Sequence, residues 1–175
     1  MNTLEAIARR KSTRSYTSVQ IPDEALEKII KAGCAAPVAR AQYDSLHITV
    51  IQNEEILSKI AESASEIVFK MMGVRKNMDF GAKTMIIVSS SASAMPEMDY
   101  ANAGIVLENM VLAATDLGID SCIMGAPTAV IAGNEELSHA AGIPEGFKPL
   151  LGAVFGYATE DAPAKEHLIS VNKVI

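Results

Sequence analysis

The sequence predicts an α+β fold in which helices flank one central mixed sheet, in a single domain over residues 1–175. Two observations predict this class. Short runs of β-forming residues alternate along the chain with segments whose apolar residues recur at helical spacing. Apolar residues make up 49% of the chain and charged residues 21%, which is typical of a globular protein. With 175 residues the chain can form a sizeable core, because a domain of this length buries about 70% of its unfolded surface.

Capping residues, glycine stops and apolar periodicity give the expected order of elements. Helices are expected at residues 3–10, 23–32, 54–72, 99–117 and 134–141. Strands are expected at residues 46–52, 84–90, 121–124 and 150–158. The Gly-Ala-Pro sequence at 125–127 is expected to be a turn.

Charge and cysteine usage argue against several classes of function. The formal net charge of −6 disfavours nucleic acid and anionic membrane surfaces as partners. Cys34 and Cys122 form no disulfide or metal pattern, and Cys34, in an alanine-rich turn, is expected to be buried. The three histidines lack metal-ligand spacing, so no metal site is expected. No signal peptide or membrane span is recognised, and a cytoplasmic protein is expected.

A basic cluster near the N-terminus is the strongest sign of a binding site. Four cations lie within the six residues 9–14. One interpretation is a solvated face. The other is an anion site, because arginine directs two hydrogen bonds onto a phosphate and lysine adds a point charge. In an extended segment Arg10, Ser12 and Arg14 would project to one side, so one phosphate could contact all three.

Two later segments have the features of loops that approach a ligand. Residues 36–42 (APVARAQ) are a connector of small residues, which would let a flat ring come close. Residues 121–127 (SCIMGAP) end a strand in a turn whose backbone N–H groups could face a ligand. Taken alone, each segment is more often an ordinary connector or turn.

In this order, these segments resemble the FMN-dependent nitroreductase family. The similarity consists of R-[RKH]-S-x-[RK] at residues 10–14, A-P-S-A-x-N at 36–41, A-A-x-x-L-G at 113–118, S-C-x-x-G at 121–125 and L-x-G-x-x-x-G-Y at 150–157. It extends along nearly the whole chain. The resemblance implies a three-layer sandwich, a homodimer with a flavin site shared by two subunits, FMN as cofactor and NAD(P)H as reductant.

The resemblance also implies where the FMN phosphate lies. Arg10, Lys11, Ser12 and Arg14 match the segment that holds the phosphate and ribose in the family. Lys165, which follows the last strand, matches a late basic residue that completes this site.

A second set of residues matches the loop that reaches the flavin from the other subunit: Pro37, Val38, Ala39 and Ala41. Val38 and Ala41 stand where the family has serine and asparagine. Each lost hydrogen bond is worth about 0.5–1.5 kcal/mol, so FMN affinity could fall by one or two orders of magnitude.

A third set lies along the flavin ring. Met124 and Gly125 match the loop whose backbone N–H meets flavin N5, and Lys76 matches, by a loose alignment, a lysine at the N1/O2 edge. No catalytic side chain is implied, because the cofactor itself carries the redox chemistry. The acceptors that the family suggests are nitro compounds, quinones and flavins. The alternative is a flavin-binding or interaction protein of this fold without efficient oxidoreductase activity.

Two features of the sequence itself favour a second subunit. The helix expected at 99–117 is apolar nearly all round and needs cover on every side. The C-terminal tail is also apolar, at Leu168, Ile169, Val171, Val174 and Ile175. Such a tail tends to fray on a monomer and would be ordered by packing on a partner.

Overall fold

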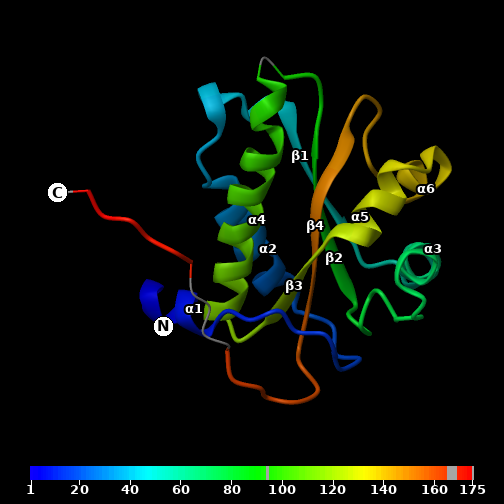
Figure 1. The fold of residues 1–175 in the computed structure, drawn as a ribbon, viewed down its shortest axis with the longest axis horizontal. Helices are drawn as coiled ribbons and strands as arrows, with labels where there is room; N and C mark the ends of the chain where they lie inside the picture. Colours follow the sequence, from blue (N-terminus) through cyan, green and yellow to red (C-terminus); the bar gives the residue numbers. More distant parts are fainter. Residues whose placement is uncertain (94, 165–168, 175) are drawn as a thin grey trace.

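The centre of the protein is a four-stranded sheet with the strand order β1-β2-β4-β3 (Figure 1). A computed structural model describes residues 1–93, 95–164 and 169–174. The strands are β1 (Leu46–Ile51), β2 (Thr84–Ser90), β3 (Asp120–Met124) and β4 (Lys148–Gly156). All three strand pairs are antiparallel, and in the described part only the isolated bridge between Ser12 and Ser121 is parallel. The prediction of a mixed sheet was therefore wrong for the described residues.

The connection between β1 and β2 explains the antiparallel pairing. Helix α3 (Glu54–Met72) carries the chain away from the end of β1, and residues 73–83 bring it back. Lys83 then pairs with Glu54, the first residue of α3, at 2.7 Å. As a result β2 begins beside the end of β1, with Met85 opposite Ile51, as in a long hairpin.

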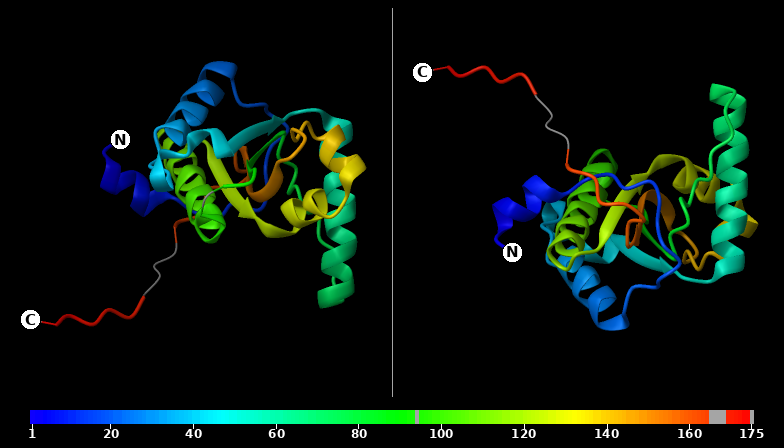
Figure 2. Two further views of the ribbon diagram at one scale, coloured as in Figure 1. Left: turned by 90° about the horizontal axis from the view of Figure 1, so that it is seen from above. Right: turned by 90° about the horizontal axis from the view of Figure 1, so that it is seen from below.

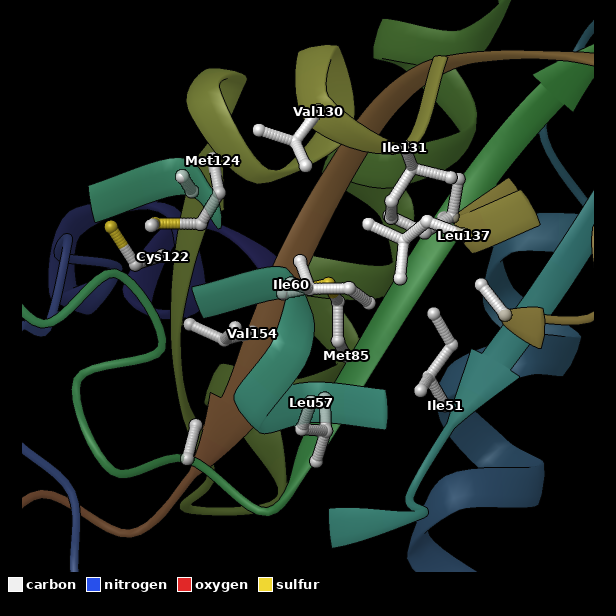
Figure 3. Close-up of a cluster of buried hydrophobic side chains, with 14 of the residues drawn as sticks. Ile51, Leu57, Ile60, Met85, Cys122, Met124, Val130, Ile131, Leu137 and Val154 are labelled. Carbon is white, nitrogen blue, oxygen red and sulfur yellow. The ribbon is translucent and has the colours of Figure 1, made fainter. Parts of the chain in front are cut away.

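Helices cover both faces of the sheet, which confirms the three-layer sandwich. The other helices are α1 (Thr3–Arg9), α2 (Asp23–Cys34), α4 (Asp99–Asp116), α5 (Gly125–Ala132) and α6 (Glu135–Ala140). Helices α2 and α4 lie on one face, and α3, α5 and α6 lie on the other (Figures 1 and 2). Side chains of β2 alternate between the two cores: Ile86 and Val88 pack toward α4, whereas Met85 and Ile87 pack into the cluster of Figure 3.

Helix α5 replaces the turn that was expected at residues 125–127. Glycine and proline indicate a turn, but Pro127 is the third residue of α5, where an N–H has no intrahelical partner to lose. The Thr128 hydroxyl donates to the Met124 carbonyl at 2.9 Å and supports this first turn. The helix consequently starts directly at the end of β3.

Two glycines of β4 allow its neighbours to pack closely. A Cβ at Gly152 would lie 2.5 Å from the Ile87 Cδ1 atom and 3.0 Å from the Thr128 hydroxyl oxygen of α5. A Cβ at Gly156 would lie 3.0 Å from the ring of Tyr16. These are the glycines of the L-x-G-x-x-x-G-Y pattern, so the pattern fixes how α5 and the N-terminal segment sit on the sheet.

Helix α4 is central, as its composition predicts, yet one side of it is uncovered. Leu107 and Met110 are fully buried, whereas Ile105 is 42% exposed. The tail extends away from the body (Figure 2), with Ile169 88%, Val171 85% and Val174 97% exposed. Within the described ranges, no helix has the length and apolar character needed to cross a membrane.

Candidate functional site

The basic arm, residues 10–14, runs extended beside β3. Ser12 forms a bridge with Ser121, and the Thr13 N–H donates to the Ser121 carbonyl at 3.0 Å. Thr13 is buried, Ser12 and Arg14 are exposed, and Arg10 is half-buried. This is the alternation of an extended segment, with Thr13 turned inward. The outer side of the arm thus presents two guanidinium groups and one hydroxyl.

Both arginines of the arm have capacity for an additional anion. Arg10 Nε lies 3.8 Å from Glu108 Oε1, and Arg14 Nη1 donates to the Ser12 carbonyl at 3.4 Å. Both contacts are long, and each guanidinium carries five N–H donors. A phosphate on this side would therefore find free donors without displacing a strong ion pair.

Lys11 is directed to the other side of the arm. Its ammonium donates to Asp161 at 3.0 Å and to the Ala162 carbonyl at 2.7 Å, and lies 3.7 Å from Asp120. The hydrogen bond from Lys11 lowers the pKa of the Asp161 carboxyl. A surface cavity of about 630 Å³ opens here and is lined by Lys11, Asp120 and Tyr157 among others. In this arrangement Lys11 ties the arm to the segment after β4.

Cys122, next to Ser12 and Arg14, and Tyr16 are buried beside the arm. Burial raises the pKa of the Cys122 thiol, and the Arg14 guanidinium and the Ser12 hydroxyl oppose this shift. Burial also raises the pKa of Tyr16, whose hydroxyl has no hydrogen-bond partner among the described residues. Both side chains are therefore neutral at physiological pH and add no negative charge beside the arm.

The junction between β3 and α5 lies along the same strand as the arm. Met124 is buried in the core (Figure 3), whereas Gly125 is exposed with open space where a Cβ would be. Ser121, which pairs with the arm, is three residues from Met124, or about 10 Å along a strand. The first N–H groups of α5 have no partners within the helix and carry its positive dipole end. One strand therefore connects the candidate anion site to a set of backbone donors.

The left-handed loop, residues 38–42, has an unusual backbone. Arg40 and Ala41 both have positive φ values, of 54° and 53°, although neither is a glycine. The Ala41 N–H donates to the Val38 carbonyl at 2.9 Å, and the Ala39 N–H donates to Oδ1 of Asn102 on α4 at 3.0 Å. Pro37, Arg40 and Ala41 are exposed. The loop thus presents backbone, small side chains and the Arg40 side chain to its surroundings.

The arm and the loop contact different sides of α4. The loop is bound at Asn102 and the arm faces Glu108, six positions later. Because a helix turns by about 100° per residue, these contacts lie about 120° apart around its axis. Figure 1 shows the loop near the N-terminal end of α4 and α1, which leads into the arm, near the C-terminal end.

The remaining predicted residues lie elsewhere. Lys76 is exposed on the segment after α3 and lines a cavity of about 770 Å³ together with Glu62, Glu66 and Arg75. Lys165 lies outside the described residues. Cys34 is exposed at the end of α2 instead of buried, because α2 continues through it and turns its side chain to solvent.

Sequence reasoning missed two residues that organise the site, Asn102 and Asp120. Asp120 accepts from the Thr13 hydroxyl at 2.9 Å and from the Ala158 N–H at 3.3 Å, so it joins both chain segments that flank β3. A polar residue in the otherwise apolar run of residues 101–107 could have pointed to Asn102. Nothing local in the sequence indicates the role of Asp120, whose partners are 107 and 38 residues away.

Several known proteins are similar to this chain in sequence, and one solved structure has the same fold. An NADH dehydrogenase/NAD(P)H nitroreductase homologue from Archaeoglobus fulgidus is 30% identical over 163 residues, covering 90% of this chain and 86% of that protein. An NADPH-flavin oxidoreductase from Vibrio harveyi is 25% identical, covering 95% of this chain and 70% of that protein. The crystal structure of a nitroreductase with bound FMN from Bacteroides fragilis superposes with a TM-score of 0.83 at 27% identity, covering 100% of this chain and 98% of that one.

The basic arm, the β3–α5 junction and the glycines of β4 all lie within the part of the chain that matches a family model. The model that describes the nitroreductase family matches residues 7–157. This match includes every described element except the first residues of α1 and the segment after β4. The chain therefore belongs to the nitroreductase family.

Proposed function

We propose that the protein is an FMN-dependent NAD(P)H oxidoreductase that passes hydride to an acceptor such as a nitro compound, a quinone or a flavin. One observation carries the proposal: the basic arm pairs with β3 at Ser121, and α5 begins where the same strand ends, about 10 Å farther along it. A ligand with a phosphate at one end and a flat, hydrogen-bonding ring at the other matches this spacing. The relatives' names and the FMN-bound neighbour support the same ligand.

The chemistry of the donor set fits the phosphate of FMN. Arg10 and Arg14 can each direct two N–H groups at phosphate oxygens, and Ser12 adds a hydroxyl donor between them. Asp120 holds the buried Thr13 and so fixes which side of the arm faces outward. In this proposal Lys11 acts by holding the segment after β4 in place, and Lys165 beyond it supplies a further cation.

The β3–α5 junction fits the ring. Gly125 leaves room for a flat ring to approach the backbone, and the N–H groups at the start of α5 can donate to it. Bound FMN supplies hydride transfer between NAD(P)H and an acceptor. Gly125 and the first N–H groups of α5 would hold the ring and donate hydrogen bonds to it, and reductant and acceptor would use the site in turn.

A spectroscopic experiment tests this function. The purified protein, or the protein after FMN is added, should be yellow with one FMN per chain. Under anaerobic conditions NADH or NADPH should bleach the flavin absorbance, and a quinone or nitroaromatic compound should restore it. Failure to take up FMN would contradict the proposal.

The same experiment distinguishes this function from the alternative, a flavin-binding protein without efficient oxidoreductase activity. Val38 and Ala41 provide no polar side chain to the flavin, which favours a flavin-binding protein with low turnover. Such a protein would take up FMN but would not be bleached by either nicotinamide cofactor. Bleaching that is fully reversed by an acceptor would exclude it.

We further propose that the protein is a homodimer. Ile105 on the uncovered side of α4 and the exposed apolar residues of the tail need cover that a single chain does not give them. Two chains related by a two-fold axis would cover both, in an interface on the order of 2,000 Å² or more. The 120° separation of arm and loop around α4 also fits a loop that serves the partner's flavin.

Sedimentation equilibrium tests the assembly. Dimers should persist to sub-micromolar protein concentration, and FMN affinity should fall where the dimer dissociates. Deleting residues 167–175 should weaken both properties together. A monomer that binds FMN stoichiometrically would contradict the shared site and the roles proposed for Pro37, Val38, Ala39 and Ala41.

A further inference from the structure

Asn102 connects the central helix to the left-handed loop. Its side chain is only 4% exposed, and its Oδ1 atom accepts the Ala39 N–H at 3.0 Å. It lies in the first turns of α4, in a stretch where most neighbours are apolar. A buried amide in such a place is costly unless it is hydrogen-bonded, so its position suggests a specific use.

The loop needs such a restraint because its backbone is strained. Left-handed backbone is unfavourable for residues with a Cβ, and Arg40 and Ala41 adopt it in succession. Such a conformation persists only when contacts around it select it. Ala36 and Val38 anchor one side through burial, and Ser45 anchors the other by donating from its hydroxyl to the Gln42 carbonyl at 2.7 Å. Between these anchors, the Asn102 bond fixes the residue immediately before the two strained positions.

We infer that Asn102 is a positioning residue that holds the loop in the conformation in which it binds flavin. The inference rests on the proposed function. Val38 and Ala41 have no polar side chain, so at these positions the fit to a ring depends on the shape of the backbone. Asn102 supplies from α4 the restraint that selects this shape. It acts through Ala39 and has no contact with the flavin in this account.

The experiment compares Asn102→Leu with the unmodified full-length protein in two measurements. The first is the rate of tryptic cleavage after Arg40, followed by mass spectrometry as fragments 1–40 and 41–175. Arg40 is exposed, so release of the loop should raise this rate. The second is FMN affinity by fluorescence quenching. We expect cleavage to become about tenfold faster and the Kd for FMN to rise about tenfold, as for loss of one restraining hydrogen bond.

Two variants make the comparison specific. Asn102→Asp keeps an acceptor oxygen, and its charge is tolerated near the N-terminus of α4, so both measurements should stay near those of the unmodified protein. Asn109→Ala removes a hydrogen bond from the same helix to the Ala32 carbonyl of α2 without touching the loop. It should leave cleavage at Arg40 unchanged. If leucine prevents folding, Asn102→Ala gives the same comparison without added volume.

The outcomes separate this inference from the proposed function. Unchanged cleavage and unchanged FMN affinity in Asn102→Leu would overturn the inference. So would faster cleavage with unchanged affinity, since the loop would then be restrained by Asn102 but would not bind flavin. It would also be overturned if Asn102→Asp behaved like Asn102→Leu. In each case, reversible bleaching of the bound flavin by NAD(P)H would still stand as the test of function.

Discussion

The basic arm and the left-handed loop contribute to the candidate site in opposite ways. The arm has regular extended backbone that is tied to β3 by backbone pairing, and its side chains carry the donors. The loop has two consecutive left-handed residues, and apart from Arg40 and Gln42 its side chains are small and apolar. In the proposed site, FMN recognition by the arm therefore depends on residue type, whereas FMN recognition by the loop depends mainly on backbone conformation. Substitutions in the arm and in the loop should therefore affect FMN binding in different ways.

The largest effect is expected in the arm. Arg10→Ala removes a guanidinium from the outward side and should weaken FMN binding by about 1.5–3 kcal/mol, or roughly 10- to 150-fold, as for a charge-assisted hydrogen bond. Fluorescence quenching measures this. Arg9→Ala is the matched control, because Arg9 has the same charge but pairs with Glu5 on α1 at 3.7 Å. Equal affinities for the two variants would mean that the arm attracts FMN only by its general charge.

The second prediction asks whether one flavin site uses the arm of one subunit and the loop of the other. Mixed dimers are prepared from one chain with Arg10→Ala and one with Asn102→Leu. If the site is shared, one of the two sites combines the unmodified arm with the unmodified loop, and half of the sites should recover the original affinity. If arm and loop act within one chain, both sites stay impaired. A titration with FMN distinguishes a two-phase curve from a single weak one.

The difference between arm and loop also explains how much could be predicted from sequence. The order of helices and strands follows from apolar periodicity and capping, and the arm follows from four cations in six residues. These are local signals. The conformation of Arg40 and Ala41 has no such signal, because neither residue favours positive φ. It depends on Asn102, which is 63 residues from Ala39.

Helix α5 is a second feature that the local sequence does not predict. Gly125 and Pro127 predict a turn when read alone, and the local sequence is ambiguous there. The helix forms because Gly152 on β4 lets Thr128 approach the sheet, and this contact is distant in sequence. The antiparallel pairing of β1 and β2 is a further case, since it depends on the path of residues 73–83. In both cases the structure depends on contacts between residues that are distant in sequence.

The third prediction concerns strain in the loop. Ala41→Asn should raise stability by about 0.5 kcal/mol, since asparagine tolerates left-handed backbone better than alanine does. It should also tighten FMN binding, by up to about tenfold, if its amide reaches the flavin. Ala41→Gly is the control, because glycine relieves the backbone without adding an amide. Thermal unfolding and FMN titration of both variants separate the two contributions.

One result for Ala41→Asn would contradict the view that an asparagine at this position restores a contact to the flavin. If Ala41→Asn is as stable as the unmodified protein but binds FMN more weakly, the amide is buried without a partner or blocks the ring. The loop would then have been rebuilt around its present small residues, and neighbouring side chains such as Arg40 or Tyr43 would be the next to test.

The smallest effect is expected for Lys11, although it stands beside Arg10 in the sequence. The Lys11 ammonium donates to Asp161 and to the Ala162 carbonyl, on the other side of the arm from Ser12 and Arg14. Lys11→Met keeps the aliphatic stem and removes this tether. Since exposed ion pairs contribute little, we expect FMN affinity to fall only about two- to threefold. A direct phosphate ligand would instead lose as much as Arg10→Ala.

A pH series sharpens the test of Lys11. Because the Lys11 ammonium lowers the pKa of Asp161, the ion pair is intact above the ordinary aspartate pKa of about 3.9 and is lost as the pH falls below it. Between pH 5 and 8 the tether is therefore constant, and the ratio of FMN affinities of Lys11→Met and the unmodified protein should not change with pH. If Lys11 binds the phosphate directly, the ratio should instead grow between pH 5 and 7, because the phosphate gains its second negative charge near pH 6. A flat ratio with a small loss would assign Lys11 to the tether and leave Arg10, Ser12 and Arg14 as the ligands on the arm.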